Sequence, residues 1–238
     1  MLPGAEPAPP VGSAGPVLRA VGLEVGYGLP VCAPITLELS AGECVAVLGP
    51  NGSGKSTFLL SVVGLRPPLG GSLEVLGAAV DERAAGFRTA VSSALGDDAF
   101  FPALTVREHL LLTAYGHGVA APDEAVDDLL AEFGLAGRAE ALPSALSSGQ
   151  RRRLVLAAAL ARPRSLLVLD EPEQRLDAGM RRRLADRLQQ ECADGGAVLF
   201  ACHDAELVGA AASSALLLTE TAAEVVPAAD GAVALGRL

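Results

Sequence analysis

The sequence has almost no lysine. Lys55 is the only lysine in 238 residues, so every other formal cation is an arginine. Lysine carries a compact point charge on a flexible stem, whereas arginine presents a broad planar fork, and the two do not replace each other at every site. A chain that otherwise avoids lysine therefore indicates that a compact positive charge is needed at position 55.

Aromatic residues are also scarce. They make up 3% of the chain, tryptophan is absent, and half of all residues are apolar. The interior must therefore be built mostly from Ala, Val and Leu. A chain of this length and composition can bury a large core within one domain. We expect residues 1–16, which are rich in Pro, Gly and Ala, to form a disordered N-terminal tail, and residues 17–238 to form a single domain.

Three further absences exclude classes of protein. The four cysteines form no CxxC pair and show no metal-ligand spacing, so we expect structural thiols. No run approaches the roughly 18 uninterrupted apolar residues of a membrane helix, and residues 1–16 lack the basic start and apolar core of a signal peptide, so we expect a cytoplasmic protein. The formal net charge of −10 argues against a nucleic-acid partner.

A glycine-rich segment surrounds the single lysine. Residues 49–57 read GPNGSGKST, a full match to the phosphate-binding pattern GxxxxGK[ST], and the apolar run Cys44–Leu48 before it indicates a buried strand. Glycines let backbone N–H groups surround a polyphosphate, Lys55 neutralises phosphate charge, and the hydroxyl of Ser56 suits Mg²⁺. A chance glycine-rich turn is the alternative. The predicted nucleotide-binding residues are Gly49, Pro50, Asn51, Gly52, Ser53, Gly54, Lys55, Ser56 and Thr57.

Two carboxylates follow a second apolar run. Residues 166–169 read LLVL, and Asp170 and Glu171 come directly after them. This pattern predicts a buried strand that delivers both acids to the carboxyl edge of a parallel sheet. Asp170 can then hold Mg²⁺, and Glu171 can deprotonate a water for attack on the γ-phosphate. An apolar run that ends in two acids is common in isolation, and the upstream phosphate loop favours the functional interpretation.

The hydrophobic pattern predicts an α/β fold. Helical stretches separate most of the later strands. A capping box at Thr105 and Glu108 and an amphipathic stretch over Asp123–Phe133 predict a mostly helical insert over residues 97–145. Strands are expected at Val17–Val25, Ile35–Leu39, Cys44–Leu48, Leu73–Leu76, Ala90–Ala94, Leu166–Leu169, Ala197–Ala201 and Ala215–Leu218.

A third motif points to a known family. Residues 146–150 read LSSGQ and stand just before an arginine-rich helix expected over residues 151–160. They resemble the LSGGQ signature of ATP-binding cassette (ABC) proteins, and the chain from about residue 17 to residue 219 resembles one ABC nucleotide-binding domain. In isolation a serine before a helix is an ordinary N-cap, although its hydroxyl, the glycine N–H groups and the helix N-terminus also suit a phosphate.

The resemblance implies a fold, a chemistry and an assembly. The fold is α/β of the P-loop NTPase class, with an ABC-type ATPase core, an antiparallel β subdomain and a helical subdomain. ATP and Mg²⁺ are the implied cofactors, with Ser56 and Asp170 on the metal and Lys55, Glu171 and His203 as catalytic residues. The family forms head-to-tail dimers in which the signature of one domain completes the site of the other. The nucleotide-binding residues assigned to that junction are Ser147, Ser148, Gly149, Gln150 and Asp177.

Three residues have one interpretation from the resemblance and a second one from their local sequence. Tyr27 resembles the aromatic residue that stacks on adenine, or it is an exposed tyrosine in a turn. Asp177 resembles the aspartate of the dimer-interface loop, or it caps a helix that begins at Ala178. His203 ends a predicted strand and resembles the histidine that senses the γ-phosphate, although a lone histidine is usually structural.

The chain also departs from the family pattern. Such domains place a glutamine between the phosphate loop and the helical insert, where it touches Mg²⁺ and links ATP to the membrane partner. Here that position aligns with Gly96, and no glutamine occurs between residues 57 and 147. We expect that Asp97 or Asp98 substitutes for it, or that this coordination is missing.

Two smaller features bear on catalysis and coupling. Ser148 stands for a glycine of the signature, and residues 173–175, EQR, replace small residues. Because the catalytic set remains, we expect hydrolysis to survive these changes. Phe100 and Phe101 precede Pro102 at the start of the insert, where such domains receive coupling helices from a permease; simple core packing is the other interpretation.

The resemblance implies the ATP-hydrolysing subunit of a transporter. Two such domains, in a homodimer or a heterodimer, would drive a separate integral membrane permease and sit on the inner face of the cell membrane. The short insert and the segment Leu104–Glu108 resemble export-type or small bacterial cassettes more than sugar importers. The alternative is a soluble ABC-type ATPase that acts as a switch or assembly factor. A P-loop kinase is disfavoured because it leaves residues 146–150 and His203 without roles.

Overall fold

The computed structural model describes residues 15–96 and 100–236 of the chain. The predicted disordered tail over residues 1–16 lies almost wholly outside this part, and so do Asp97 and Asp98, the predicted substitutes for the missing glutamine. Across the described ranges, no helix combines the length and the apolar character needed to cross a bilayer.

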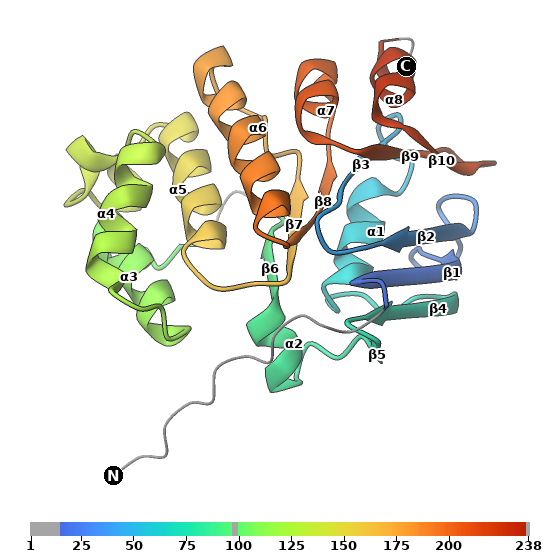
Figure 1. Ribbon diagram of the computed structural model, residues 1–238, viewed down its shortest axis with the longest axis horizontal. Coiled ribbons are helices and arrows are strands. Elements are labelled where there is room, and N and C mark those ends of the chain that lie inside the picture. Colours follow the sequence, from blue (N-terminus) through green and yellow to red (C-terminus); the bar gives the residue numbers. More distant parts are fainter. Residues whose placement is uncertain (1–14, 97–99, 237–238) are drawn as a thin grey trace.

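Strands occur at every predicted segment, with ends that shift by a few residues. The described strands are β1 (Leu18–Glu24), β2 (Ile35–Leu39), β3 (Cys44–Leu48), β4 (Gly70–Val75), β5 (Ala78–Ala79), β6 (Val91–Ala94), β7 (Leu166–Asp170), β8 (Ala197–Ala201), β9 (Ser214–Leu218) and β10 (Ala223–Pro227). The described helices are α1 (Lys55–Val62), α2 (Ala85–Ala90), α3 (Val106–Gly116), α4 (Pro122–Glu132), α5 (Ser148–Leu160), α6 (Ala178–Ala193), α7 (Ala205–Ala211) and α8 (Ala228–Leu235). The larger of two sheets runs through the middle of this arrangement (Figure 1).

The larger sheet is mostly parallel. Its strand order is β10-β9-β3-β8-β7-β6, and β10 alone pairs antiparallel within it. Val47 of β3 lies opposite Ala201 of β8, and Ala201 lies opposite Asp170 of β7. Because parallel strands end at the same edge, this register brings the segments that follow β3, β7 and β8 together.

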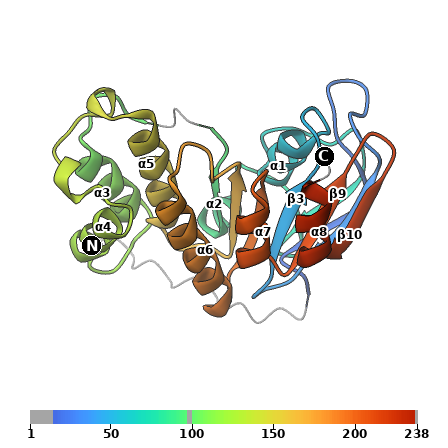
Figure 2. The ribbon, with the colours of Figure 1, turned by 90° about the horizontal axis from the view of Figure 1, so that it is seen from above.

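A smaller antiparallel sheet has the order β2-β1-β4-β5. It lies with α1 on one face of the larger sheet, whereas α5, α6, α7 and α8 stand side by side along the other face (Figures 1 and 2). The helices α3 and α4 pack beside α5, at the far end from the small sheet. The predicted α/β fold with an antiparallel β part and a helical part is therefore confirmed.

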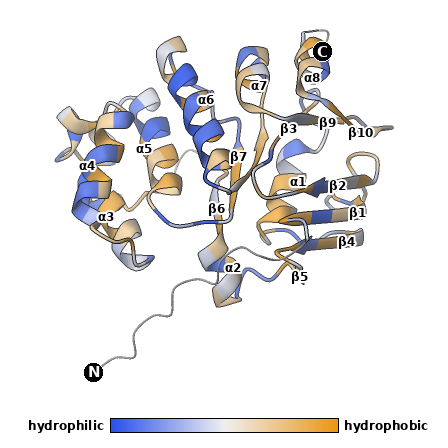
Figure 3. Ribbon diagram, in the orientation of Figure 1, coloured by the Kyte–Doolittle hydropathy of each residue, from blue (hydrophilic) through white to orange (hydrophobic). Residues whose placement is uncertain are grey.

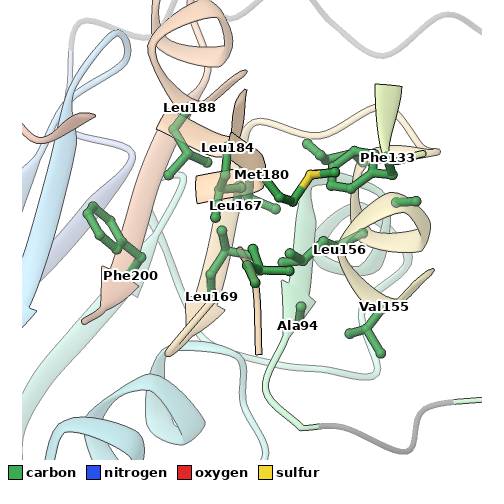
Figure 4. Packing of buried hydrophobic residues seen from close by; sticks show 14 of the residues in the cluster. Ala94, Phe133, Val155, Leu156, Leu167, Leu169, Met180, Leu184, Leu188 and Phe200 are labelled. Carbon is green, nitrogen blue, oxygen red and sulfur yellow. The ribbon is translucent and has the colours of Figure 1, made fainter. Parts of the chain in front are cut away.

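Strands β3, β7 and β8 of the larger sheet are buried on both faces, and their alternate residues serve two different cores. In β7, Leu167 and Leu169 pack with the helices α3 to α7, whereas Leu166 and Val168 pack with α1 and the small sheet. Figure 4 shows residues of the first core from α6, α5, β7 and β8 gathered around one another. Because both faces of β7 are buried, its sequence is an uninterrupted apolar run. In contrast, much of α6 is hydrophilic (Figure 3).

Side-chain hydrogen bonds cap the N-termini of α3 and α5. The predicted capping box of α3 is present, since Thr105 accepts from the backbone N–H of Glu108 and Glu108 accepts from that of Thr105. The helix expected over residues 151–160 begins earlier, at Ser148, because Ser147 and Gln150 form a second capping box. Such caps stabilise a helix by about 1 kcal/mol each.

Some boundaries and elements differ from the predicted set for local reasons. β4 stops at Val75 because Leu76 and Gly77 both have positive φ, 54° and 74°, and form the tight turn into β5. The predicted set lacks α2, β5, β10 and α8. Helix α8 has no side-chain cap and carries Gly231 in its middle, so it lacks ordinary helix signals. Gly231 is required because an added Cβ would lie 2.5 Å from the Cβ of Ala215.

Replacing Phe200 by alanine should destabilise the protein strongly. Phe200 lies in β8, is fully buried, and belongs to the core between the sheet and the helices (Figure 4). A Phe to Ala change at such a site costs about 3–5 kcal/mol, because it removes buried apolar area and leaves a cavity. Urea unfolding measures the loss. The control is Val225→Ala on the half-exposed strand β10, which should cost about 0.5 kcal/mol or less; equal losses in the two variants would contradict this core assignment.

Candidate active site

The loop between β3 and α1 has the backbone that a phosphate cradle needs. Gly49 has a φ of 154° and Gly54 a φ of 91°, both in the region that favours glycine. A Cβ at Gly49 would lie 2.1 Å from the carbonyl oxygen of Leu218, and one at Gly54 would lie 2.9 Å from Val31. Side chains at these positions would therefore disrupt the loop. The loop ends at α1, so the helix N-terminus faces the same space.

Lys55 is the first residue of α1, and its side chain turns back over the loop. Its Nζ donates to the carbonyl oxygens of Gly49 at 2.9 Å and Pro50 at 3.0 Å. Burial lowers the pKa of this ammonium group, while the nearby charges of Glu171, Asp170 and Glu173 oppose that shift. The only lysine of the chain is thus a buried cation beside an acidic cluster.

Asp170 ends β7 and lies against the start of α1. Burial raises the pKa of its carboxylate, and the nearby hydroxyl of Ser56 partly opposes that rise. One carboxylate oxygen, Oδ1, is buried without a hydrogen-bond partner among the described residues. A carboxylate with an unpaired buried oxygen beside a hydroxyl is an oxygen donor set that fits Mg²⁺.

Glu171 and His203 follow neighbouring strands and meet at the sheet edge. Nε2 of His203 lies 3.2 Å from Oε1 of Glu171. Glu171 has a φ of 47°, which is uncommon for a residue with a side chain, and its N–H donates to the carbonyl of Ala201 at the end of β8. The contact between β7 and β8 thus continues past the strands and places the predicted base beside the predicted histidine.

The segment after Glu171 forms hydrogen bonds to both residues of this pair. Glu173 is buried, and its Oε1 accepts from the backbone N–H of His203 at 2.7 Å. Gln174 donates from its side-chain amide to Oε2 of Glu171. Burial raises the pKa of Glu173, an effect that the hydrogen bond from His203 partly offsets. Neither residue is among the predicted site residues, although both belong to the segment that departs from the family pattern.

Arg152 is a further site residue that the motifs do not identify. It is buried in α5, and its NH2 group donates to the main-chain carbonyls of Asp170 and of Glu171, the latter at 2.7 Å. Hydrogen bonds from a charged donor are stronger than neutral ones, at about 1.5–3 kcal/mol each. Arg152 therefore ties the helix of the LSSGQ segment to the strand end that carries both acids. Its only signal in the sequence is its place in an arginine triplet.

A small open hollow lies beside these acids. Its volume is about 170 Å³, and it is lined by Leu95, Gly96, Arg152, Asp170, Glu171 and Gln174. Gly96, the position aligned with the missing glutamine, thus borders the same space as the two acids. The alternatives proposed for that glutamine, Asp97 and Asp98, are outside the described residues.

The signature segment lies at the start of α5. Ser147 and Gln150 are joined in the capping box, and Ser148 and Gly149 form the first turn of the helix. An added Cβ on Gly149 would lie 2.8 Å from the carbonyl oxygen of Arg175, so the segment packs against the chain that follows Glu171. Among the described residues, no hydrogen bond joins residues 147–150 to the phosphate loop of the same chain.

The remaining predicted residues lie apart from this cluster. Tyr27 is 65% exposed, and the guanidinium carbon of Arg66 lies 3.7 Å above its ring. Asp177 caps α6 by accepting from the N–H of Met180 at 2.8 Å, so the capping interpretation holds. Its assignment to nucleotide binding and that of Tyr27 stay predictions.

Phe100 and Phe101 differ in their surroundings. Phe100 is half-buried and packs against the core of the helical part, as the core-packing interpretation expects. Phe101 is 56% exposed, and its ring centroid lies 5.8 Å from that of the buried His109. Phe100 thus packs against the core, whereas Phe101 lies at the surface.

The sequence is similar to a known family and to known proteins. The profile of the family described as ABC transporter matches residues 32–174. The Nod factor export ATP-binding protein I of Rhizobium meliloti is 36% identical over 205 residues, which cover 85% of this chain and 59% of that protein. The cytochrome c biogenesis ATP-binding export protein CcmA of Bordetella parapertussis is 36% identical over 196 residues, covering 82% of this chain and 88% of that protein.

Solved structures share the fold. An ATP-binding subunit of an ABC transporter matches with a TM-score of 0.82 and 26% identity, covering 90% of this chain and 91% of that one. A dimeric post-hydrolysis state of an ATP-binding cassette bound to ADP and Pi matches with a TM-score of 0.78 and 20% identity, covering 89% of this chain and 98% of that one. This second match shows a shared fold only.

The family profile spans more than half of the chain, and relatives above 30% identity cover more than two thirds of it. The chain itself spans between half and two thirds of the length of the Nod factor export relatives that it matches. The order and spacing of the phosphate loop, the LSSGQ segment and the acidic strand end agree with this match. The chain belongs to the ABC transporter family, as its motifs predict.

Proposed function

We propose that this chain is the ATP-hydrolysing subunit of an ABC transporter and works as a head-to-tail dimer that powers solute transport through a separate permease. The observation that carries the proposal is the meeting of four features at one sheet edge: the phosphate loop, Asp170, Glu171 and His203. A site that binds and cleaves a polyphosphate uses all four together.

The phosphate loop and Lys55 bind the triphosphate of ATP. The N–H groups of the loop and the N-terminus of α1 surround the phosphate oxygens, and Lys55 neutralises their charge. Ser56 and Asp170 hold Mg²⁺, which when bound neutralises charge on the phosphate oxygens. Tyr27 stacks on the adenine, which requires Arg66 to share or leave the ring face it occupies.

Glu171 acts as the general base. Its carboxylate accepts a proton from the water that attacks the γ-phosphate in line with the leaving oxygen. His203, whose Nε2 lies 3.2 Å from Glu171, reports the γ-phosphate, because it follows β8, the neighbour of the strand that leads into the phosphate loop. Lys55 stabilises the charge that develops on the transferred group.

A second ABC ATPase domain completes each site. Ser147, Ser148, Gly149 and Gln150 open α5 and are not bonded to their own phosphate loop, so they are available to the nucleotide of a partner. A hydroxyl, glycine N–H groups and a helix N-terminus together suit phosphate oxygens. Asp177, in the segment that packs beside Gly149, lies at the same junction of the dimer. ATP binding closes the pair, and hydrolysis reopens it.

The motion of the dimer drives a permease, with export as the favoured direction. Support comes from the relatives, whose names describe ATP-binding proteins of export systems. The subunit lies in the cytoplasm, on the inner face of the membrane. There the exposed Phe101 contacts the permease. Nucleic acid is not a partner, given the net charge of −10.

Copurification separates transport from a soluble switch. The tagged full chain is extracted from its own cells in mild detergent, and proteins that remain bound are identified by mass spectrometry. We expect an integral membrane protein at a ratio of one or two permease chains per ATPase dimer. Recovery of a soluble protein as the only stoichiometric partner would favour the switch or assembly factor instead.

Replacing Glu171 by glutamine should stop hydrolysis and keep ATP binding. Glutamine has the same shape but accepts no proton, so turnover should fall by at least about 100-fold while ATP traps a dimer. Phosphate release measures turnover, and size-exclusion chromatography with ATP measures the dimer. Glu224→Gln on the surface of β10 is the matched control and should leave both unchanged. A monomeric Glu171→Gln variant with normal turnover would remove Glu171 as the base.

Replacing Ser147 by arginine should stop turnover through the partner site. The bulky cation blocks the approach of the signature to the nucleotide, whereas ATP affinity of the monomer should change by less than about twofold. The variant also loses a helix cap, which costs about 1 kcal/mol. Thr105→Ala removes the cap of α3 at a similar cost and should keep turnover. A large loss of ATP affinity in monomeric Ser147→Arg would place Ser147 in the site of its own chain.

A further inference from the structure

The segment Glu173–Arg175 is the part of the sequence that the proposed function leaves unused. Within it, Gln174 is exposed, yet its side-chain amide donates to Oε2 of Glu171. The other carboxylate oxygen of Glu171 lies 3.2 Å from Nε2 of His203. Each oxygen of this carboxylate therefore has a polar neighbour from a different segment of the chain, and the Gln174 amide is a hydrogen-bond donor to it.

The backbone fixes where Gln174 can reach. The positive φ of Glu171 turns the chain back on itself, and the N–H of Gln174 donates to the carbonyl of Glu171 at 3.1 Å. Arg152 donates to that same carbonyl at 2.7 Å and anchors the turn from the side of α5. Main chain and side chain of Gln174 thus both bond to Glu171, so the amide has a defined position relative to the carboxylate.

The amide also faces the space where Gly96 supplies no side chain. Gln174, Gly96, Asp170 and Glu171 line one hollow of about 170 Å³. A neutral amide suits a base better than a cation does, because it orients the carboxylate by one hydrogen bond and adds no full charge that would weaken it as a proton acceptor. Its carbonyl oxygen remains as an acceptor for a water molecule.

We propose that Gln174 is a positioning residue for hydrolysis, whose side-chain amide holds the carboxylate of Glu171 toward the hollow beside Asp170. This inference rests on the proposed function, since it requires Glu171 to act as the base. It assigns a role to one of the residues that depart from the family pattern. The hydrogen bond reduces the freedom of the Glu171 side chain, and loss of that orientation slows the chemical step without changing ATP binding.

The test replaces Gln174 by methionine in the full chain. Methionine keeps the length of the side chain and removes the N–H donor, and the exposed position makes the change compatible with folding. We expect kcat to fall about tenfold, with KM for ATP and the Kd of a non-hydrolysable ATP analogue within about twofold of the original. The Gln174→Glu variant keeps the shape of the side chain but repels Glu171, so its kcat should fall further.

A matched control comes from the same chain. Gln190 is also exposed and donates from its side-chain amide to the carboxylate of Asp194 at 2.8 Å, at the far end of α6. Gln190→Met removes the same kind of bond and should leave kcat and KM unchanged. A fall in kcat of similar size in both variants would mean a general loss of stability and would overturn the positioning role.

A double variant separates this inference from the proposed function. If Gln174 acts through Glu171, Glu171→Gln combined with Gln174→Met should turn over no more slowly than Glu171→Gln alone. Unchanged or faster turnover in Gln174→Met, beside a strong loss in Glu171→Gln, would overturn the positioning role and leave the base assignment intact. Normal turnover in Glu171→Gln, or none in the original chain, would overturn both.

Discussion

The shared carboxyl edge of β3, β8 and β7 is the constraint on which the rest of the site depends. Their parallel register sets Val47, Ala201 and Asp170 in one row, so the three chain segments that follow must leave the sheet together. A strand buried on both faces cannot slip by one residue without turning its apolar side chains to the wrong core. The same packing that stabilises the fold therefore fixes the distances within the site.

This arrangement concentrates negative charge in a buried place, and the structure balances it from two directions. Asp170, Glu171 and Glu173 lie near Lys55, whose charge acts on all three. Arg152 approaches from α5 and bonds the main-chain carbonyls of the strand end. Uncompensated buried charges cost several kcal/mol each. A cation held by Asp170 and Ser56 would relieve the remaining imbalance, which agrees with the unpaired Oδ1 of Asp170.

The sequence predicts those parts of the fold and of the site that depend on neighbouring residues. The strand before Gly49, the acids after Leu169 and the capping box at Thr105 all follow from local patterns, and the fold contains each of them. The bonds of Glu173 to His203 and of Gln174 to Glu171 could not be predicted, because they depend on a reversal of the chain at a non-glycine residue with positive φ. No residue type signals such a turn.

Two of the departures from the family pattern, at Gly96 and at Gln174, meet in the folded chain. In the sequence, Gly96 and Gln174 stand far apart, one before the helical insert and one after the acidic strand. In the fold they line one hollow, because β6 and β7 are parallel neighbours and end at the same edge. Gly96 brings no side chain to this hollow, whereas Gln174 brings an amide that donates to Glu171. An amide thus reaches the acids from the segment that follows β7, and not from the position after β6 where the family pattern would place one.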